Sequence, residues 1–253
     1  GFHKTGTTSV QSLIDVNRAT LQRRIRPFLK TDFDGLTEAA RAFSLDPGAL
    51  TLAEVTRQAE AFFATIDPAD TRPVLMSSED LSGHLPGRHG LTCYDAAALV
   101  MSQIADVVRH RFGPDGNLVF FFSTRARAAW LRSTWWQNLR STRLTEDFDS
   151  YADRIAAAAD LPAVVAEVRD AVSPFTVRDM ALEDSTTMPE GPLSPLLDLL
   201  PVPPRMRRKL TLLAPENVQP ALGLEPVFLA LNRSGLNDRA LALAKKHIRR
   251  LAN

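Results

Sequence analysis

The chain opens with a segment that is crowded with groups able to bind an anion, Gly1-Phe2-His3-Lys4-Thr5-Gly6-Thr7-Thr8-Ser9. An amphipathic run follows from Val10 to Asp15 with the spacing of a helix. Glycine permits tight turns and lets backbone N–H groups approach a ligand, and a helix N-terminus adds unpaired N–H donors. The composition therefore predicts a loop that wraps a phosphate or sulfate group and then begins a helix.

Single side chains of this segment strengthen the predicted site. Lys4 supplies a full positive charge, and Thr7, Thr8 and Ser9 have hydroxyls that either cap the helix or donate to the same anion. A capped helix with a solvated lysine is the simpler interpretation, but it requires fewer such groups than the segment holds. The residue order also differs from the G-x-x-x-x-G-K-[ST] loop of nucleotide triphosphatases, because Lys4 precedes Gly6.

An arginine and a serine mark a second candidate anion site. Leu118–Phe122 has the apolar composition of a buried strand, and Arg125 follows its end. Ser133 lies eight residues further along, inside a helix expected over Ala128–Arg140. An arginine at a strand tip can hold a phosphate through two hydrogen bonds, and a nearby hydroxyl can add a third. The alternative is a solvated arginine and a serine at the edge of the core.

The same helix carries three tryptophans with different expected roles. Trp130, Ser133 and Gln137 follow one another at spacings of three and four residues, so they share a face that we expect to line a substrate cleft. Trp135 and Trp136 point elsewhere, and we expect them to pack in the core.

A carboxylate after another apolar run is a candidate general base. Pro73–Met76 is typical of a buried parallel strand and ends in Ser77-Ser78-Glu79-Asp80. A positioned base accelerates a reaction by roughly 10²–10⁴-fold, and we favour Glu79 for that role. Alternatively, Glu79 caps the next helix, or His84 in the following loop is the base. His3, within the first segment, either contacts the anion or packs.

These residues require a fold that brings strand ends together. Short apolar runs predict strands at Phe28–Leu29, Pro73–Met76, Leu118–Phe122 and Phe175–Met180. The helices expected between and around them include Ser9–Arg26, Thr51–Ile66 with a Thr51/Glu54 capping box, Tyr94–Phe112, Ala128–Arg140, Arg205–Leu213 and one from Asn232 to the end. This alternation predicts a single α/β domain over residues 1–253, with an open parallel sheet, helices on both faces and ligands at the carboxyl ends of the strands.

Composition narrows the classes of function. The chain has 253 residues with 45% hydrophobic content, enough for one large core. Its net charge of +1 gives no general reason for nucleic-acid binding, and no apolar run reaches the roughly 18 residues of a membrane span. A single cysteine, Cys93, favours a reducing compartment, and we expect a cytoplasmic location. No Cys/His cluster has the spacing of a metal site.

The motifs together resemble a known family. His-Lys-Thr-Gly-Thr-Thr-Ser, from His3 to Ser9, resembles the 5′-phosphosulfate loop of the PAPS-dependent sulfotransferases, most closely a bacterial branch of them. Arg125…Ser133 matches the spacing of the family's 3′-phosphate motif, although Arg127 stands where the commoner form has a proline. Ser-Ser-Glu is similar to the base segment of bacterial members. The resemblance implies a P-loop-like fold whose first strand would lie upstream of Gly1.

The resemblance also implies a function. Lys4 and residues Thr5, Gly6, Thr7, Thr8 and Ser9 would bind PAPS, whose product is PAP, and Arg125 and Ser133 would hold the 3′-phosphate. Glu79 would deprotonate a hydroxyl or amine group of the acceptor. The acceptor would be a small molecule or a carbohydrate, with lipid-linked sugars among the candidates. The basic run Arg205–Lys209 either closes over the 3′-phosphate or is a solvated helix face. Two alternatives remain: a P-loop kinase or NTPase, and a non-catalytic module that binds PAP or PAPS.

Overall fold

The structure, a computed structural model, describes residues 1–113, 116–213 and 223–251, so the predicted domain of residues 1–253 extends over short stretches outside the described residues. All four predicted strands are confirmed, with ends that shift by one or two residues. They are β1 (Arg26–Leu29), β2 (Val74–Ser77), β3 (Val119–Thr124) and β4 (Thr176–Ala181). Every strand pairing is parallel, as the alternation of strands and helices predicts.

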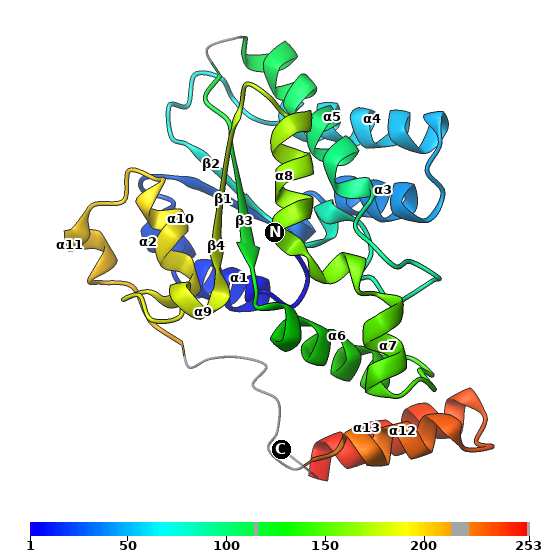
Figure 1. The fold of residues 1–253 in the computed structure, drawn as a ribbon. Coiled ribbons are helices and arrows are strands. Elements are labelled where there is room, and N and C mark those ends of the chain that lie inside the picture. Colours follow the sequence, from blue (N-terminus) through cyan, green and yellow to red (C-terminus); the bar gives the residue numbers. More distant parts are fainter. Residues whose placement is uncertain (114–115, 214–222, 252–253) are drawn as a thin grey trace.

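The strands form two small sheets where the sequence predicts one open sheet. β1 pairs with β2 and β3 pairs with β4, and no strand among the described residues joins the two pairs (Figure 1). The first loop contacts both sheets: Ser82, just after β2, donates to the carbonyl of Gly1 at 3.0 Å, and Ser123 on β3 donates to the carbonyl of Thr5. This loop therefore lies at the ends of both strand pairs.

Helices cover both faces of the β1–β2 sheet, as predicted. Val74 and Met76 pack against the larger core cluster, whose buried residues come mainly from α3 to α8. Leu75, between them in sequence, belongs to a second cluster with Leu13 and Ile14 of α1. Successive residues of β2 thus point to opposite, equally covered faces, as expected for a buried parallel strand.

The helices and 3₁₀ turns (η) of the first half differ from prediction chiefly at their ends. They are α1 (Thr7–Val16), α2 (Arg18–Leu21), η1 (Lys30–Asp32), α3 (Asp34–Leu45), α4 (Ala49–Ala64), η2 (Asp80–Ser82), α5 (Ala96–Phe112) and α6 (Arg127–Ser141). The single helix predicted over Ser9–Arg26 divides at Asn17, whose side-chain amide donates to the carbonyl of Leu13. Asparagine commonly interrupts helices in this way, because its side chain competes for backbone groups.

The second half is made of shorter elements. They are α7 (Phe148–Arg154), η3 (Ala157–Ala159), α8 (Leu161–Ala171), α9 (Leu182–Ser185), η4 (Gly191–Leu193), α10 (Ser194–Asp198), α11 (Pro204–Arg207), α12 (Glu225–Arg233) and α13 (Asp238–Leu251). The helix predicted over Arg205–Leu213 shortens to α11. Asn232, which we expected to start the last helix, lies instead in the last turn of α12, where its amide donates to the carbonyls of Leu139 and Leu144.

The predicted capping box of α4 is wrong. The helix begins at Ala49, and the Thr51 hydroxyl accepts from the backbone N–H of Gly48 at 3.1 Å, within the first turn. Glu54 instead pairs with Arg57 one turn along, at 2.6 Å. The helix start therefore moves back to the Pro47-Gly48 turn, and the predicted capping acid becomes a surface ion-pair partner.

Candidate functional site

The first loop has the backbone geometry of an anion-binding turn. Lys4 and Gly6 both have positive φ angles, 66° and 89°. Gly6 is the N-cap residue of α1 and no side chain caps this helix, so its first N–H groups are left for a ligand. A Cβ atom on Gly6 would lie 2.6 Å from Cδ1 of Leu182. Glycine is thus required here both by the left-handed backbone and by the close approach of α9.

Several buried contacts hold the loop in this shape. The hydroxyl of Thr5 donates to the carbonyl of Phe2 at 2.7 Å, and Thr7 donates to the same carbonyl at 3.2 Å. The indole of Trp130 donates to the carbonyl of His3 at 2.9 Å. Thr5 is fully buried, so its side chain faces the interior, away from the predicted cofactor. The prediction that Trp130 lines the cleft is wrong: it is also fully buried and anchors the loop.

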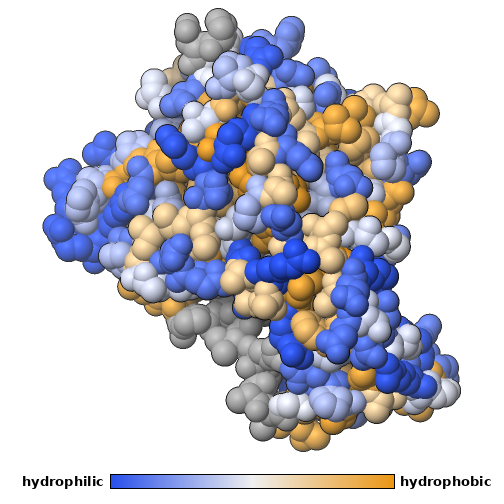
Figure 2. All heavy atoms as spheres, viewed as in Figure 1, coloured by the Kyte–Doolittle hydropathy of each residue, from blue (hydrophilic) through white to orange (hydrophobic). Residues whose placement is uncertain are grey.

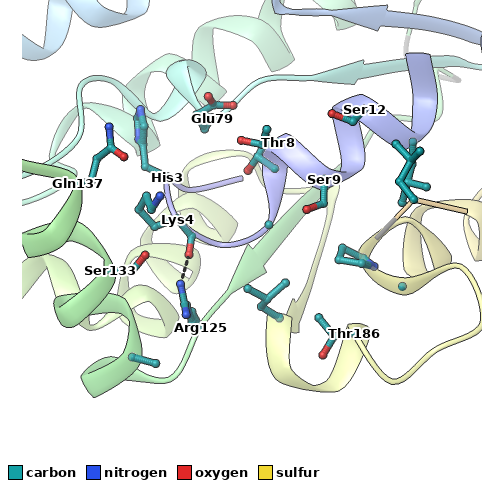
Figure 3. A pocket seen from close by; sticks show the side chains of 18 of the residues that line it. His3, Lys4, Thr8, Ser9, Ser12, Glu79, Arg125, Ser133, Gln137 and Thr186 are labelled. Atoms are coloured by element: carbon teal, nitrogen blue, oxygen red, sulfur yellow. Dashed lines mark hydrogen bonds between the residues drawn. The ribbon is translucent and has the colours of Figure 1, made fainter. Parts of the chain in front are cut away.

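The loop borders a cavity of about 950 Å³ between α1, α6, α9 and the ends of β2 and β3 (Figure 3). Most of the residues that the sequence singles out meet there. Those that line the cavity are His3, Lys4, Gly6, Thr7, Thr8, Ser9, Glu79, Arg125, Ser133 and Gln137. Thr5 and His84 are not among the lining residues, and Trp136, which we expected only in the core, is.

The two predicted anion motifs contact each other, although 121 residues separate them. Nη1 of Arg125 donates to the carbonyl of Lys4 at 3.0 Å (Figure 3). Nε of Arg125 is buried without a hydrogen-bond partner, and Glu183 is 3.9 Å away. Among the described residues, no hydrogen-bond or ion-pair partner contacts the ammonium of Lys4 or the hydroxyl of Ser133. The site thus offers the ammonium of Lys4 and the hydroxyl of Ser133 to one ligand, beside the guanidinium group of Arg125.

The electrostatics of the loop favour the binding of an anion. The pKa of Lys4 is lowered to about 8, chiefly by burial and then by the positive charges of Arg140, Arg125 and Arg88, while the charge of Glu79 opposes them. An anion bound here would reverse these effects, because it would stabilise the charged amine.

Glu79 lies at the cavity wall and is held from two sides. Its Oε2 accepts from Nε2 of Gln11 at 3.0 Å, and its Oε1 lies 3.4 Å from the ammonium of Lys30. Its side chain is 14% exposed. Each carboxylate oxygen has two lone pairs, so both keep capacity for a proton or a further hydrogen bond. The carboxylate is therefore both fixed in place and accessible from the cavity.

His3 is committed to neighbours at both ring nitrogens. Its Nε2 lies 3.2 Å from Asp80, and its Nδ1 lies 3.3 Å from the hydroxyl of Tyr94. Asp80 also pairs with Arg41 at 3.4 Å. Burial acts to raise the pKa of Asp80, but the hydrogen bond and charge of His3, with Arg41 and Lys30, outweigh it and lower that pKa. His3 is thus an oriented ring whose nitrogens are already used.

Sequence reasoning missed three arginines of this cavity, Arg88, Arg132 and Arg140. Arg88 donates from Nε to Asn138 at 2.7 Å and from Nη2 to Ser141 at 2.6 Å. Arg140 donates to the side-chain oxygen of Gln137. The helical spacing from Ser133 through Gln137 could have found Arg140, but no local pattern marks Arg88, which comes from the loop after β2. Other residues that line the cavity and that the sequence analysis did not single out include Leu182, Thr186, residues 188–192 and Leu212–Leu213.

The basic run of Arg205, Arg207, Arg208 and Lys209 does not line the cavity. Arg207 pairs with Asp198, and the other three are exposed in the hydrophilic surface over α11 (Figure 2). Within the described structure these residues form a solvated face, the second of the two roles that the sequence left open.

Comparisons with models of protein families, with curated proteins and with solved structures gave no match to this chain. Within the described ranges, no helix has both the length and the apolar character needed to cross a bilayer. Across the same residues, no three His, Cys, Asp or Glu side chains gather as a metal ion would require.

Proposed function

We propose that this protein is a sulfotransferase that moves the sulfuryl group of PAPS to a hydroxyl or amine acceptor. The observation that carries the proposal is the contact between the two anion motifs, in which Arg125 donates to the carbonyl of Lys4 at 3.0 Å. In this proposal the 5′-phosphosulfate of PAPS binds at the loop, and its 3′-phosphate binds at Arg125 and Ser133.

In the proposed reaction, the acceptor oxygen or nitrogen forms a bond to sulfur as the bond from sulfur to the 5′-phosphate oxygen breaks. That oxygen takes the electron pair of the broken bond, and PAP leaves. Lys4 and the N–H groups of α1 stabilise the charge that develops on it. Glu79 takes the acceptor proton and passes it to solvent. We assign the base role to Glu79 over His3 because both nitrogens of His3 already have partners.

The proposal is tested by calorimetric titration with PAP, and with ATP in the presence of Mg²⁺. We expect saturable binding of PAP that is equal with Mg²⁺ and with a chelator. Binding of Mg²⁺–ATP without binding of PAP would instead support the kinase or NTPase alternative. Binding of PAPS without transfer to any hydroxyl or amine acceptor would support the alternative of a non-catalytic module that binds PAP or PAPS.

A further inference from the structure

The cavity holds more positive charge than its two predicted anion motifs require. Its cationic lining residues are Lys4, Arg88, Arg125, Arg132 and Arg140, and its carboxylates are Glu79 and Glu190. Five cations and two carboxylates give the lining a charge of +3, although the whole chain has a net charge of only +1. Positive charge is therefore concentrated in this cavity.

Arg88 and Arg140 are the unusual members of this set. Their side-chain partners within the described residues are neutral: Asn138 and Ser141 for Arg88, and Gln137 for Arg140. No ion pair is formed by either of them in the described part of the chain. Burial lowers the pKa of both guanidinium groups, and for Arg140 the charges of Arg249 and Arg88 lower it further. An arginine held in this way retains N–H donors for an external anion.

Their position separates them from the proposed 3′-phosphate site. Arg140 follows Ser133 by seven residues on α6, which corresponds to about 10 Å along a helix axis. Arg88 meets α6 at Asn138 and Ser141, also near its C-terminal end. The charges of Arg140, Arg125 and Arg88 all act on Lys4, so the three guanidinium groups lie near its ammonium. Arg88 and Arg140 thus lie near the C-terminal end of α6, away from Ser133, and within reach of Lys4.

We propose that Arg88 and Arg140 bind an anionic group of the acceptor, so that the substrate is a hydroxyl or amine that also carries a carboxylate, sulfate or phosphate. This inference rests on the proposed function, since only a sulfuryl donor at Lys4 makes the neighbouring space an acceptor site. Paired guanidinium groups favour such planar or tetrahedral oxyanions through parallel hydrogen bonds.

The test uses inorganic sulfate as the probe and the PAP-saturated protein as the target, so that the nucleotide site is already filled. Binding is followed by NMR of the arginine Nε–H groups. We expect saturable binding of sulfate, weakened about tenfold or more by Arg88→Gln and by Arg140→Gln, because a hydrogen bond to a charged group is lost. Affinity for PAP stays within about twofold. Arg127→Gln, an exposed arginine of α6 outside the cavity, is the control for net charge.

Three results overturn the inference. One is the absence of saturable sulfate binding to the PAP complex, and a second is binding that both arginine variants leave unchanged. The third is an equal loss of PAP affinity in these variants, which would assign the arginines to the nucleotide. In each of these cases PAP still binds the wild-type protein, so the proposed function survives. A wild-type protein that binds no PAP overturns the proposed function and this inference together.

Discussion

The two ends of the cavity are built in different ways. At the loop end, made of Lys4, Arg125 and Ser133, the guanidinium group of Arg125 is held by the backbone, since it donates to the carbonyl of Lys4. At the arginine end, made of Arg88 and Arg140, the cations are held by neutral side chains of α6. The loop end is therefore suited to one fixed ligand, and the arginine end can change its ligand by side-chain substitution alone.

The largest expected effect is at Glu79, which lines the same cavity. Glu79→Gln keeps the side-chain shape but removes the base, so we expect transfer from PAPS to fall by roughly 10²–10⁴-fold. Affinity for PAP should not change. The rate of transfer is measured as the initial rate with radiolabelled PAPS and an acceptor that the wild-type protein sulfates. The affinity for PAP is measured by calorimetry. Glu60→Gln, on the exposed face of α4, is the control, and an undiminished rate in Glu79→Gln would exclude the base assignment.

The two ends should also respond differently to pH. Lys4 has a pKa of about 8 in the free protein, and an anion binds better to its charged form. Below pH 8 its titration has little effect, and above pH 8 affinity for PAP should fall by up to about tenfold per pH unit. The ligand does not cause this fall, because a phosphate monoester has a second pKa of about 6. Calorimetry from pH 7 to pH 10 measures the affinity for PAP as a function of pH. In Lys4→Met this affinity should no longer fall above pH 8. Sulfate binding at the arginine end should lack this step.

Gly6→Ala should damage the loop end alone. An alanine with a φ of 89° is strained, and its Cβ would meet Leu182, so we expect about 1 kcal/mol or more of lost stability and roughly tenfold weaker binding of PAP. Gly90 is a matched control: its φ is 79° but a Cβ there would meet nothing within 4 Å. Gly90→Ala should lose stability in denaturant melts through backbone strain alone, and should keep full affinity for PAP. Equal affinities in the two variants would argue against the loop as the binding element.

The smallest expected effect concerns the anchor of the loop. Trp130→Phe removes the hydrogen bond to the carbonyl of His3 and should cost about 1 kcal/mol of stability. Trp135 lies on the same helix, and Trp135→Phe removes an equivalent bond to the carbonyl of Glu146, which lies after the end of α6. Both variants should melt earlier in denaturant, but only Trp130→Phe should weaken PAP binding, by a few fold. If both variants weaken it equally, the effect comes from α6 and not from the loop.

The same contrast explains what could be predicted from the sequence. The loop end is encoded locally, because glycine, lysine and hydroxyl residues stand next to each other and Arg125 follows a strongly apolar strand. The arginine end is assembled from distant segments, so the sequence analysis did not find it, although the helical spacing of Arg140 from Ser133 and Gln137 could have marked that residue. Trp130 was placed incorrectly, and the inward turn of the Thr5 side chain was not foreseen, because local sequence does not say which polar groups turn inward to hold a backbone carbonyl.

The apolar segments that predict the strands did not show that the strands form two separate pairs, β1 with β2 and β3 with β4. Each strand was recognisable from its apolar composition, and parallel pairing followed from the helices between the strands. Which strands are neighbours depends on long-range packing, such as Val74 and Leu75 facing different core clusters. Local pattern therefore predicted the elements and their direction, but not their grouping.

One measurement tests the central claim most directly: calorimetric affinities of PAP and of adenosine 5′-phosphate, which differ only in the 3′-phosphate, for the wild-type protein and for Arg125→Gln. We expect the wild-type protein to prefer PAP by at least about tenfold, as hydrogen bonds to a charged phosphate would provide. Arg125→Gln should abolish most of this preference and leave the affinity for adenosine 5′-phosphate nearly unchanged. Equal wild-type affinity for the two nucleotides, or an undiminished preference in Arg125→Gln, would contradict the account.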